Sequence, residues 1–482
     1  MEDIAFGSGA VLFFCFYLVG MLSLGYWARH IRKIESLDEF YLAGKSLGGF
    51  VLLLTLYATQ YSGNTLLGYP GEAYRLGFAW IMSVGFMMSI VVVYLLFAPR
   101  LYALARRHKF VTPGDWIDHR FGSPTLTVIT NLLLIVAVAN FLLAQLMAMG
   151  HVVAGLSGKV IPYWGGVVFL ALIIIVYETL GGMRAVAWTD FIQGLMLLLG
   201  LMGLLIAAVP DIKSLRVVTE WIAANVPEKA VVPSWSIIRT WISTVLLVGF
   251  SGAVYPQAIQ RIYAARSSRS LKHSLSLMVF MPLASTFVVF LIGILGIAHF
   301  ANLEGVTADR VMPLLLQEWA GQSTWLYILV VMVITGILAA IMSTADSVLL
   351  SLSSILAKDF LGKTLLKHAP ETQVTKAGKY VSWGIMAMLV VIALIPRITL
   401  WGLTELKMEL LSQVSPVIIL GVLWRKLSSQ AALAGVLGGS TLAVSLTLAG
   451  YGKLWGFHAG LLGWGLNLCL CVTMTYFFPR NK

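Results

Sequence analysis

The sequence predicts an all-α, polytopic membrane protein, and its composition is the first evidence for that fold class. Of the 482 residues, 59% are hydrophobic and only 11% are charged, whereas ordinary soluble domains carry about 25% charged residues. The mean hydropathy is +0.88. So few charges do not cover the surface of a soluble protein of 52.6 kDa, but they suit a protein whose surface faces mostly lipid.

A series of long apolar runs is the second observation. A helix needs about 20 apolar residues to cross the roughly 30 Å hydrocarbon core of a bilayer. Because unpaired backbone groups cannot face lipid, such runs form helices, and a transmembrane barrel would show alternating strands of about ten residues instead. We predict thirteen spans, near residues 6–28, 48–70, 77–98, 125–153, 161–179, 188–209, 239–257, 274–299, 322–350, 380–396, 398–424, 429–450 and 455–478.

The positions of the basic residues predict the orientation of these spans. Short loops rich in Lys and Arg face the cytoplasm. With the N-terminus outside and the C-terminus inside, the cytoplasmic segments hold 23 of the 33 basic residues. The main basic segments are Arg29–Lys33, Arg100–Lys109, Arg261–Lys272, Lys358–Lys379 and Arg425–Lys426.

Composition and motifs also exclude several classes of protein. A net charge of +12 would suggest nucleic acid only on a soluble domain with a basic face, so we expect no nucleic-acid partner. All three cysteines lie in apolar segments, which argues against a disulfide framework or a zinc site. The start Met-Glu-Asp lacks the basic region of a cleavable signal peptide. A membrane enzyme would need convergent catalytic groups, and we see none; we expect no organic cofactor either.

The chain reads as one membrane domain over residues 1–482. The two longer external segments, 210–238 and 301–321, are too short to form domains. The first of them is expected to hold a short helix at Val217–Ala224.

Two spans carry helix breakers at their centres. The second contains Ser62-Gly63, and the seventh contains Ser251-Gly252 and Pro256. Such residues free backbone groups at mid-bilayer, which is tolerated only where they line a cavity or are buried in protein. Packing and kinks are the alternative explanation for either helix alone. Because the two breaks are five spans apart, together they favour a transporter site built from inverted repeats.

The ninth span, which contains TGILAAIMSTADSVLLSLSS, has a polar face. Ala339 and Ala340 are small enough to let another helix approach closely. The polar side chains that follow are Ser343, Thr344, Asp346 and Ser347. Helical spacing puts Ser343 on one face with residues 346–347, and such oxygens suit a small hard cation. The alternative is that the hydroxyls bond to their own helix and that Asp346 lies near the cytoplasmic interface.

Four motifs in order make the chain resemble the sodium/solute symporter family, which includes proline and pantothenate permeases and sodium-coupled sugar and sialic acid transporters. The motifs are FYLAGKSLGG before the second span, GGMRAVAWTDFIQG at the sixth, AAIMST in the ninth, and SPVIILGVLWRK with AALAGVLGG in the eleventh and twelfth. The resemblance implies a five-plus-five inverted-repeat core of the LeuT type. It divides the chain into an extra N-terminal helix at 6–28, repeats at 48–209 and 239–424, and two C-terminal helices at 429–478.

The resemblance also implies a sodium site between the first broken helix and the ninth span. Its ligands would be the backbone oxygens of Ala58, Tyr61 and Ala340 and the hydroxyls of Ser343 and Thr344.

Some family members bind a second sodium ion, and the residues here that match this possible second sodium or proton site are Asp190, Ser343, Asp346 and Ser347. Asp346 replaces the serine expected at that position, which leaves open a proton site or a tighter cation site. An N-cap for the helix that begins with FIQGLMLL is the alternative role of Asp190.

The substrate pocket is expected at mid-membrane beside the breaks. Its candidate lining residues are Gln60, Asn64, Phe141, Gln145, Phe250, Ser251, Tyr255 and Lys407. Proline permeases carry an aspartate where this chain has Gln60, and aromatics where it has Val248 and Gly252, so proline is a poor candidate. Lys407 lies roughly 14 Å into its span at 1.5 Å per residue. It therefore needs a carboxylate from another helix or from the substrate, unless it snorkels to the surface.

These observations predict a secondary active transporter that takes up a small organic solute with sodium by alternating access. An amino acid, a monocarboxylate and a vitamin-like organic anion are the candidate solutes. A proton-coupled symporter of the same fold and a non-transporting membrane sensor are the alternatives. We expect a multi-pass protein of the bacterial inner (plasma) membrane, in contact with lipid, sodium and its solute, that functions as a monomer.

Overall fold

The structure is a computed structural model, and it describes residues 7–31, 35–157, 160–213, 215–300, 303, 305–395 and 400–477. The long helices are α1 (Gly7–Ile31), α3 (Gly49–Gln60), α5 (Met82–His108), α7 (Pro124–Leu156), α8 (Tyr163–Lys213), α10 (Trp235–Gly252), α13 (Met281–His299), α15 (Thr324–Ser354), α16 (Glu371–Ala393), α17 (Leu400–Leu423), α18 (Ser429–Leu448) and α19 (Ala459–Phe477).

Shorter elements connect these helices or cap them. The shorter helices are α2 (Leu37–Leu42), α4 (Tyr69–Leu76), α6 (Pro113–Phe121), α9 (Leu215–Asn225), α11 (Pro256–Ala264), α12 (Ser268–Met278) and α14 (Val311–Ala320). The single-turn and π-helical segments are η1 (Ala43–Lys45), η2 (Asn64–Gly68), η3 (Gly77–Ile81), η4 (Pro227–Lys229), η5 (Gly305–Arg310) and η6 (Ile355–Leu361). A small antiparallel hairpin joins β1 (Lys453–Leu454) to β2 (Phe457–His458).

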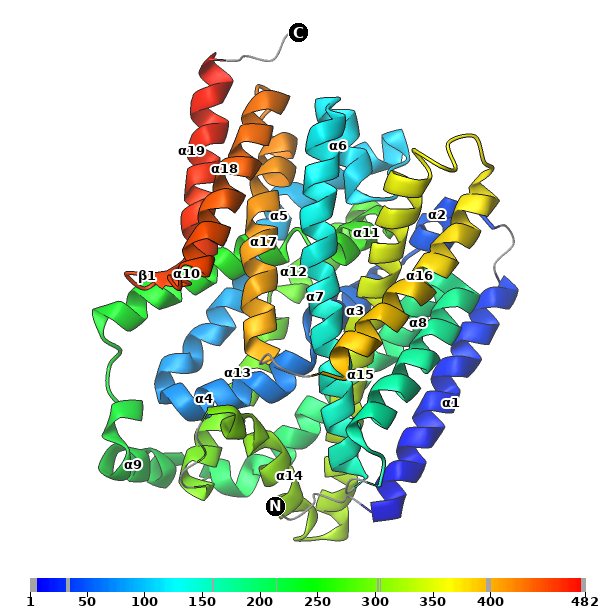
Figure 1. Ribbon diagram of the computed structural model, residues 1–482. Coiled ribbons are helices and arrows are strands. Elements are labelled where there is room, and N and C mark those ends of the chain that lie inside the picture. The colour runs from blue at the N-terminus through cyan, green and yellow to red at the C-terminus, as the bar shows by residue number, and fades with distance from the viewer. Residues whose placement is uncertain are drawn as a thin grey trace.

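The long helices form one bundle, in which α15 is central and α1 and α19 lie at opposite edges (Figure 1). In the most apolar 18-residue stretch of α15, 78% of residues are buried, against 28% in α1, α16 and α19. Helix α1 begins at the end of the bundle where α9 and α14 lie, and α19 ends at the opposite end (Figure 1). The prediction of an all-helical, polytopic membrane fold is confirmed.

The number of helices that could cross a membrane differs from the predicted thirteen spans. Among the described residues, ten helices are long and apolar enough to cross a membrane, or up to eleven when the bent pair α10–α11 counts as one span. One reason for the difference is α8, whose 51 residues continue from one predicted span into the next across Gly182, where φ is 57°. A second is the stretch Thr65–His108, which joins half of the broken second span to the third. The count of thirteen therefore stays a prediction.

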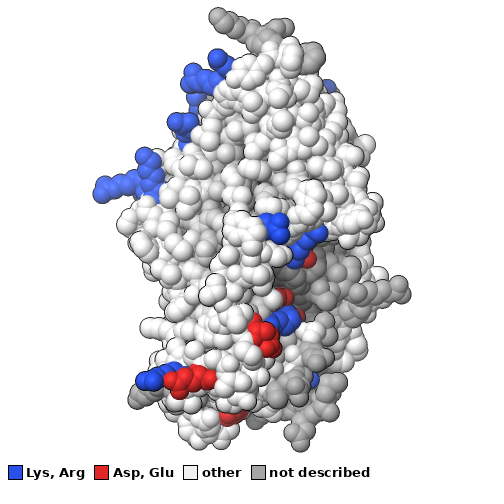
Figure 2. All heavy atoms as spheres, turned by 90° about the vertical axis from the view of Figure 1, so that its left-hand side faces the viewer, with Lys and Arg blue, Asp and Glu red and all other residues white. Residues whose placement is uncertain are grey.

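Charged side chains are sparse on the lipid-facing surface. Figure 2 shows a broad uncharged area on one face of the molecule, with Lys and Arg side chains gathered toward the end where α19 finishes. Ion pairs hold segments together at that end: Arg184 bonds Glu39 at 2.5 Å, and Lys363 bonds Asp118 at 2.9 Å. The predicted orientation, with the N-terminus outside and the C-terminus inside, stays a prediction. The predicted external helix Val217–Ala224 lies within α9.

Both predicted helix breaks are present. Helix α3 ends at Gln60, and the chain continues through the π-helical η2 into α4. Helix α10 ends at Gly252, and α11 starts at Pro256 with a bend of 50°. Side chains from neighbouring helices satisfy some of the freed backbone groups, as the absence of water inside a membrane requires. Gln145 accepts a hydrogen bond from the Gly63 amide at 3.3 Å, and Tyr94 donates to the Gly252 carbonyl at 3.1 Å.

Gly63 is expected to be required for close packing of the first break on α15. A Cβ added there would lie 2.5 Å from Ile341 Cγ1 and 3.3 Å from Ala148 Cβ. Gly63→Ala should therefore destabilise the protein by about 1–3 kcal/mol through overpacking. Gly85 in α5 is a matched control, since a Cβ there meets nothing within 4 Å. Thermal unfolding of both variants in detergent checks this, and an equal melting temperature for the two would contradict it.

Candidate functional site

The end of α3 lies against the polar face of α15. Thr59 Oγ1 is 3.4 Å from Ser347 Oγ, and Gly63 packs on Ile341. These two contacts lie next to the expected sodium ligands in the sequence, so the structure brings together the segments that contain Ala58, Tyr61, Ala340, Ser343 and Thr344. All five residues are buried.

The chemistry of these five residues fits a sodium ion. Helix α3 ends at Gln60, two residues after Ala58. In a longer helix the Ser62 amide would donate to the Ala58 carbonyl, but here it donates to Thr65 Oγ1. The Ala58 carbonyl therefore lacks its helical partner. Thr344 Oγ1 donates to the Ala340 carbonyl at 3.0 Å, and Ser343 Oγ donates to Asp190 Oδ1 at 2.5 Å. Both hydroxyls thus keep lone pairs for a hard cation, which prefers oxygen ligands.

The four residues expected at a second cation site also lie together. Ser343 bonds Asp190, Ser347 Oγ donates to Asp346 Oδ1 at 3.1 Å, and Tyr177 donates to Asp346 Oδ2 at 2.6 Å. Asp190 and Asp346 are fully buried. Asp190 lies inside α8, well beyond the Gly182 kink, so it is not the N-cap that we considered as an alternative. Asp346 does not face water in this structure, because its side chain is enclosed by the helix bundle.

Arg261 is a residue of the buried cluster that the sequence analysis missed. We assigned it to a cytoplasmic loop, and that assignment is wrong: Arg261 lies on α11 with its side chain 0% exposed. Its Nη2 is 2.6 Å from Asp190 Oδ2 and 2.5 Å from Ser347 Oγ. Its Nε donates to Thr55 Oγ1 at 2.7 Å, and Thr55 in turn donates to Asp190. The signal in the sequence was the position of Arg261 five residues after Pro256, which keeps it on the second half of the broken span.

The buried cluster therefore contains two carboxylates and one guanidinium. With both acids ionised, Arg261 neutralises one of them and leaves one net negative charge. A buried charge without compensation is costly. The cluster can thus accept one further cation, and Asp346 is the acid that has no bond to Arg261 among the hydrogen bonds of the described residues.

Four of the expected substrate-pocket residues converge beside the second break. Lys407 Nζ lies 3.3 Å from the centroid of the Phe141 ring and 5.0 Å from that of Tyr255. The Phe141 and Tyr255 rings are 5.8 Å apart. Ser251 lies on the same side, where its hydroxyl and that of Tyr255 contact Met408 Sδ at 2.9 and 3.4 Å.

Two glutamines connect this group to the first break. Gln145 bonds the Gly63 amide, and Gln60 Nε2 donates to Tyr94 OH at 2.6 Å, which donates onward to the Gly252 carbonyl. The structure does not bring Phe250 to this group, since its ring packs on Trp464 of α19 at 4.5 Å between centroids. The side chain of Asn64 lies outside the described part of the structure.

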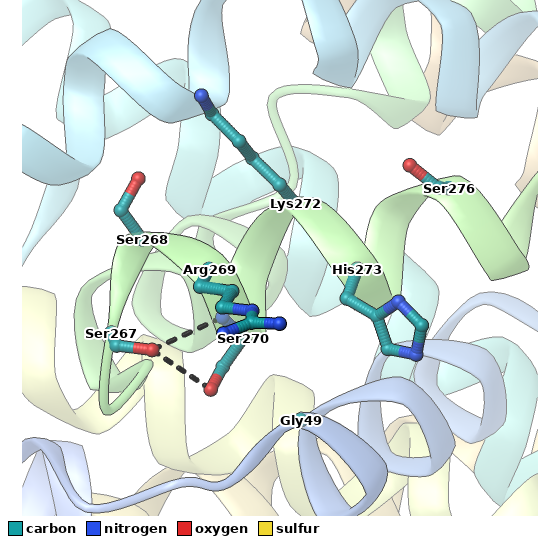
Figure 3. A pocket seen from close by; sticks show the side chains of 8 residues that line it. All are labelled: Gly49, Ser267, Ser268, Arg269, Ser270, Lys272, His273 and Ser276. Atoms are coloured by element: carbon teal, nitrogen blue, oxygen red, sulfur yellow. Dashed lines mark hydrogen bonds between the residues drawn. The ribbon is translucent and has the colours of Figure 1, made fainter.

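A separate hollow of about 820 Å³ opens at the surface beside the start of α12. It is lined by Gly49, Ser267, Ser268, Arg269, Ser270, Lys272, His273 and Ser276. Figure 3 shows these side chains pointing in different directions, with Ser267 bonded to Ser270 as the N-cap of α12. None of the expected sodium or substrate residues lines this hollow. A narrow gap with no room for a water molecule lies instead next to Gln60 and Tyr61.

Comparison with known proteins supports this picture of the fold. Residues 40–439 match the profile described as "Sodium:solute symporter family". The chain is 27% identical to the high-affinity proline transporter PutP of Bacillus subtilis (strain 168), over 92% of this chain and 94% of that protein. It is 26% identical to the sodium/pantothenate symporter of Escherichia coli (strain K12), over 90% of this chain and 89% of that protein.

A solved structure shares the fold. It is described as the substrate-bound outward-open state of a Na⁺-coupled sialic acid symporter, and it superposes with a TM-score of 0.81 at 17% identity, over 99% of both chains. At 17% identity the likeness establishes the fold alone.

Proposed function

This chain belongs to the sodium:solute symporter family, and we propose that it couples sodium entry to the uptake of a small organic solute by alternating access. It is a multi-pass protein of the plasma membrane. The observation that carries the proposal is the meeting of a broken helix end with the Ser343 and Thr344 hydroxyls of α15. Freed carbonyls and hydroxyls at mid-membrane are the ligands that transporters of this design use for coupling ions.

Sodium is proposed to bind Ala58, Tyr61, Ala340, Ser343 and Thr344. Because these ligands come from α3 and α15, which are connected only through long stretches of chain, sodium would hold the two helices together. A ligand shifts a conformational equilibrium by its difference in affinity for the two states. Sodium would thus favour the state in which the adjacent substrate site is formed, and the solute would favour sodium binding by the same factor.

We propose that the function of the protein is transport and not catalysis. We also propose that the monomer is the functional unit. The proposed sodium and substrate ligands all come from one chain. The charged groups of the buried cluster are bonded to one another and not arranged as a nucleophile with its base, as an enzyme would require.

Thermal unfolding in sodium tests the proposed sodium site. A ligand that binds only the folded state raises the melting temperature by mass action. Sodium chloride should raise the melting temperature of the purified protein in a saturable way, and potassium chloride at equal ionic strength should not. Equal effects of the two salts would contradict the sodium site and favour the proton-coupled or sensor alternatives.

Asp346 is proposed to hold a second cation, either sodium or a proton, against the remaining negative charge of the cluster. Asp346→Asn should lower the number of cations moved per solute by one, while sodium dependence through the first site persists. The measurement is the reversal potential of uptake in proteoliposomes at several sodium and pH gradients. Asp359→Asn is a matched control, since Asp359 is also buried and bonded to Thr112 and Asn131. An unchanged stoichiometry in Asp346→Asn would exclude this role.

A further inference from the structure

We propose that Lys407 is the residue that binds the charged end of the solute, and that the solute is a monocarboxylate anion without an ammonium group. The proposal rests on the proposed function and narrows its substrate class. It starts from the position of Lys407, which lies on α17 beside the second helix break.

Lys407 is buried and does not reach the membrane surface. It is 2% exposed, whereas a snorkelling lysine places its ammonium group in water. Its Nζ lies over the Phe141 ring at 3.3 Å from the centroid, and Tyr255 is the second ring beside it. The faces of aromatic rings attract a cation, but by only about 0.5–2 kcal/mol. The rings therefore orient the ammonium group more than they neutralise it.

No ion pair between residues that the structure describes includes Lys407. The two acids on its own helix are engaged elsewhere: Glu405 lies 3.1 Å from Lys453 and 3.7 Å from His458, and Glu409 accepts a hydrogen bond from Thr447 at 3.1 Å. A buried charge whose partner is missing is strongly unfavourable. A carboxylate that arrives with the solute would supply the missing partner.

The backbone adds a second source of positive potential. Helix α11 begins at Pro256, directly after Tyr255, so its N-terminal end lies beside the ring that Lys407 contacts. The N-terminus of a helix carries about half a positive charge, and the half-helices of transporters direct such ends at anionic substrate groups. The electrostatic potential at the start of α11 therefore has the same sign as the charge of Lys407.

An amino acid fits this place poorly. Its ammonium group would need an acidic partner, and the two acids next to Lys407 in the sequence are already bonded, Glu405 to Lys453 and Glu409 to Thr447. The rings of Phe141 and Tyr255 lie beside Lys407, and Tyr255 also contacts Met408. They suit an apolar body attached to a single carboxylate.

The test is thermal unfolding of the detergent-purified protein in sodium with three sets of compounds. The sets are small monocarboxylates, the matching primary amides, and amino acids including proline. We expect a carboxylate to raise the melting temperature only when sodium is present, and its amide to have no effect. Lys407→Met, which keeps the length of the side chain, should weaken carboxylate binding about 10-fold or more. In the absence of solute it should raise the melting temperature, since it removes an unpaired buried charge.

Lys453→Met is the matched control, because Lys453, on β1, is half-exposed and paired with Glu405 of α17, two residues before Lys407. It should leave carboxylate binding unchanged. Equal carboxylate affinity in Lys407→Met and wild type would overturn the proposal, and so would an amide or an amino acid as the preferred ligand. A sodium effect without any carboxylate effect would overturn the substrate class and leave the sodium site standing. Absence of a sodium effect would count against the proposed function. In that case the charge of Lys407 is still tested, because a solute-free Lys407→Met variant with a melting temperature no higher than that of wild type would contradict an unpaired buried charge at this position.

Discussion

Arg261→Gln is expected to destabilise the protein by about 3–5 kcal/mol, because it leaves Asp190 as a buried carboxylate without its counter-charge. The two side chains are both 0% exposed and their charged atoms are 2.6 Å apart. Arg261 also bonds Ser347 and Thr55, so its loss breaks contacts among α3, α11 and α15 at once. Thermal or denaturant unfolding measures the effect.

A double variant separates loss of the ion pair from loss of packing. Asp190→Asn combined with Arg261→Gln replaces both charges with amides, so the unpaired charge disappears and most of the lost stability should return. A surface control is Arg216→Gln, whose partner Glu220 lies 2.8 Å away while the two side chains are 90% and 61% exposed. Such pairs contribute about 0–1 kcal/mol. If the destabilising effects of Asp190→Asn and Arg261→Gln were simply additive, the ion pair between these residues would not be the source of the lost stability.

Thr344→Ala is expected to raise the sodium concentration needed for half-maximal effect by about 10-fold or more, since it removes one hydroxyl ligand of a charged ion. The structural effect of the same substitution should be small. Thr344 is bonded within α15 only to the Ala340 carbonyl at 3.0 Å, and such back-bonding does not strengthen a helix.

The same helix provides a close control. Thr335 is also buried in α15, and it donates to the Val331 carbonyl at 2.9 Å in the same i−4 pattern. Thr335→Ala should change stability to a similar degree without changing sodium dependence. Sodium titrations of melting temperature or of uptake compare the two variants. A similar loss of sodium affinity in both would show that Thr344 acts through the helix and not as a ligand.

The helices, the helix breaks and the polar face of the ninth span could be predicted from the sequence, because they depend on local residue patterns. Apolar runs long enough to cross a bilayer became helices, and glycine and proline at mid-span became the breaks after Gln60 and Gly252. The polar spacing in the ninth span placed Ser343, Asp346 and Ser347 near one another, as the structure shows. These features follow from helix geometry and from the lack of water in the membrane.

What the sequence did not predict depends on contacts between distant segments. Arg261 was placed in a loop because basic residues near a span end normally face water, and only the packing of α11 on α3 and α15 buries it. Phe250 neighbours Ser251 in the chain, yet its ring turns to Trp464 of α19. Tyr94 and Tyr177 were missed for the same reason, since their hydroxyls find partners on other helices.

Uptake into sealed proteoliposomes tests the central claim most directly. With an inward sodium gradient, equal pH on both sides and no membrane potential, a radiolabelled monocarboxylate should accumulate above its external concentration and then leak away as the gradient decays. An inward proton gradient without sodium should give no accumulation. Accumulation driven by protons alone, or mere equilibration under the sodium gradient, would contradict sodium-coupled symport by this protein.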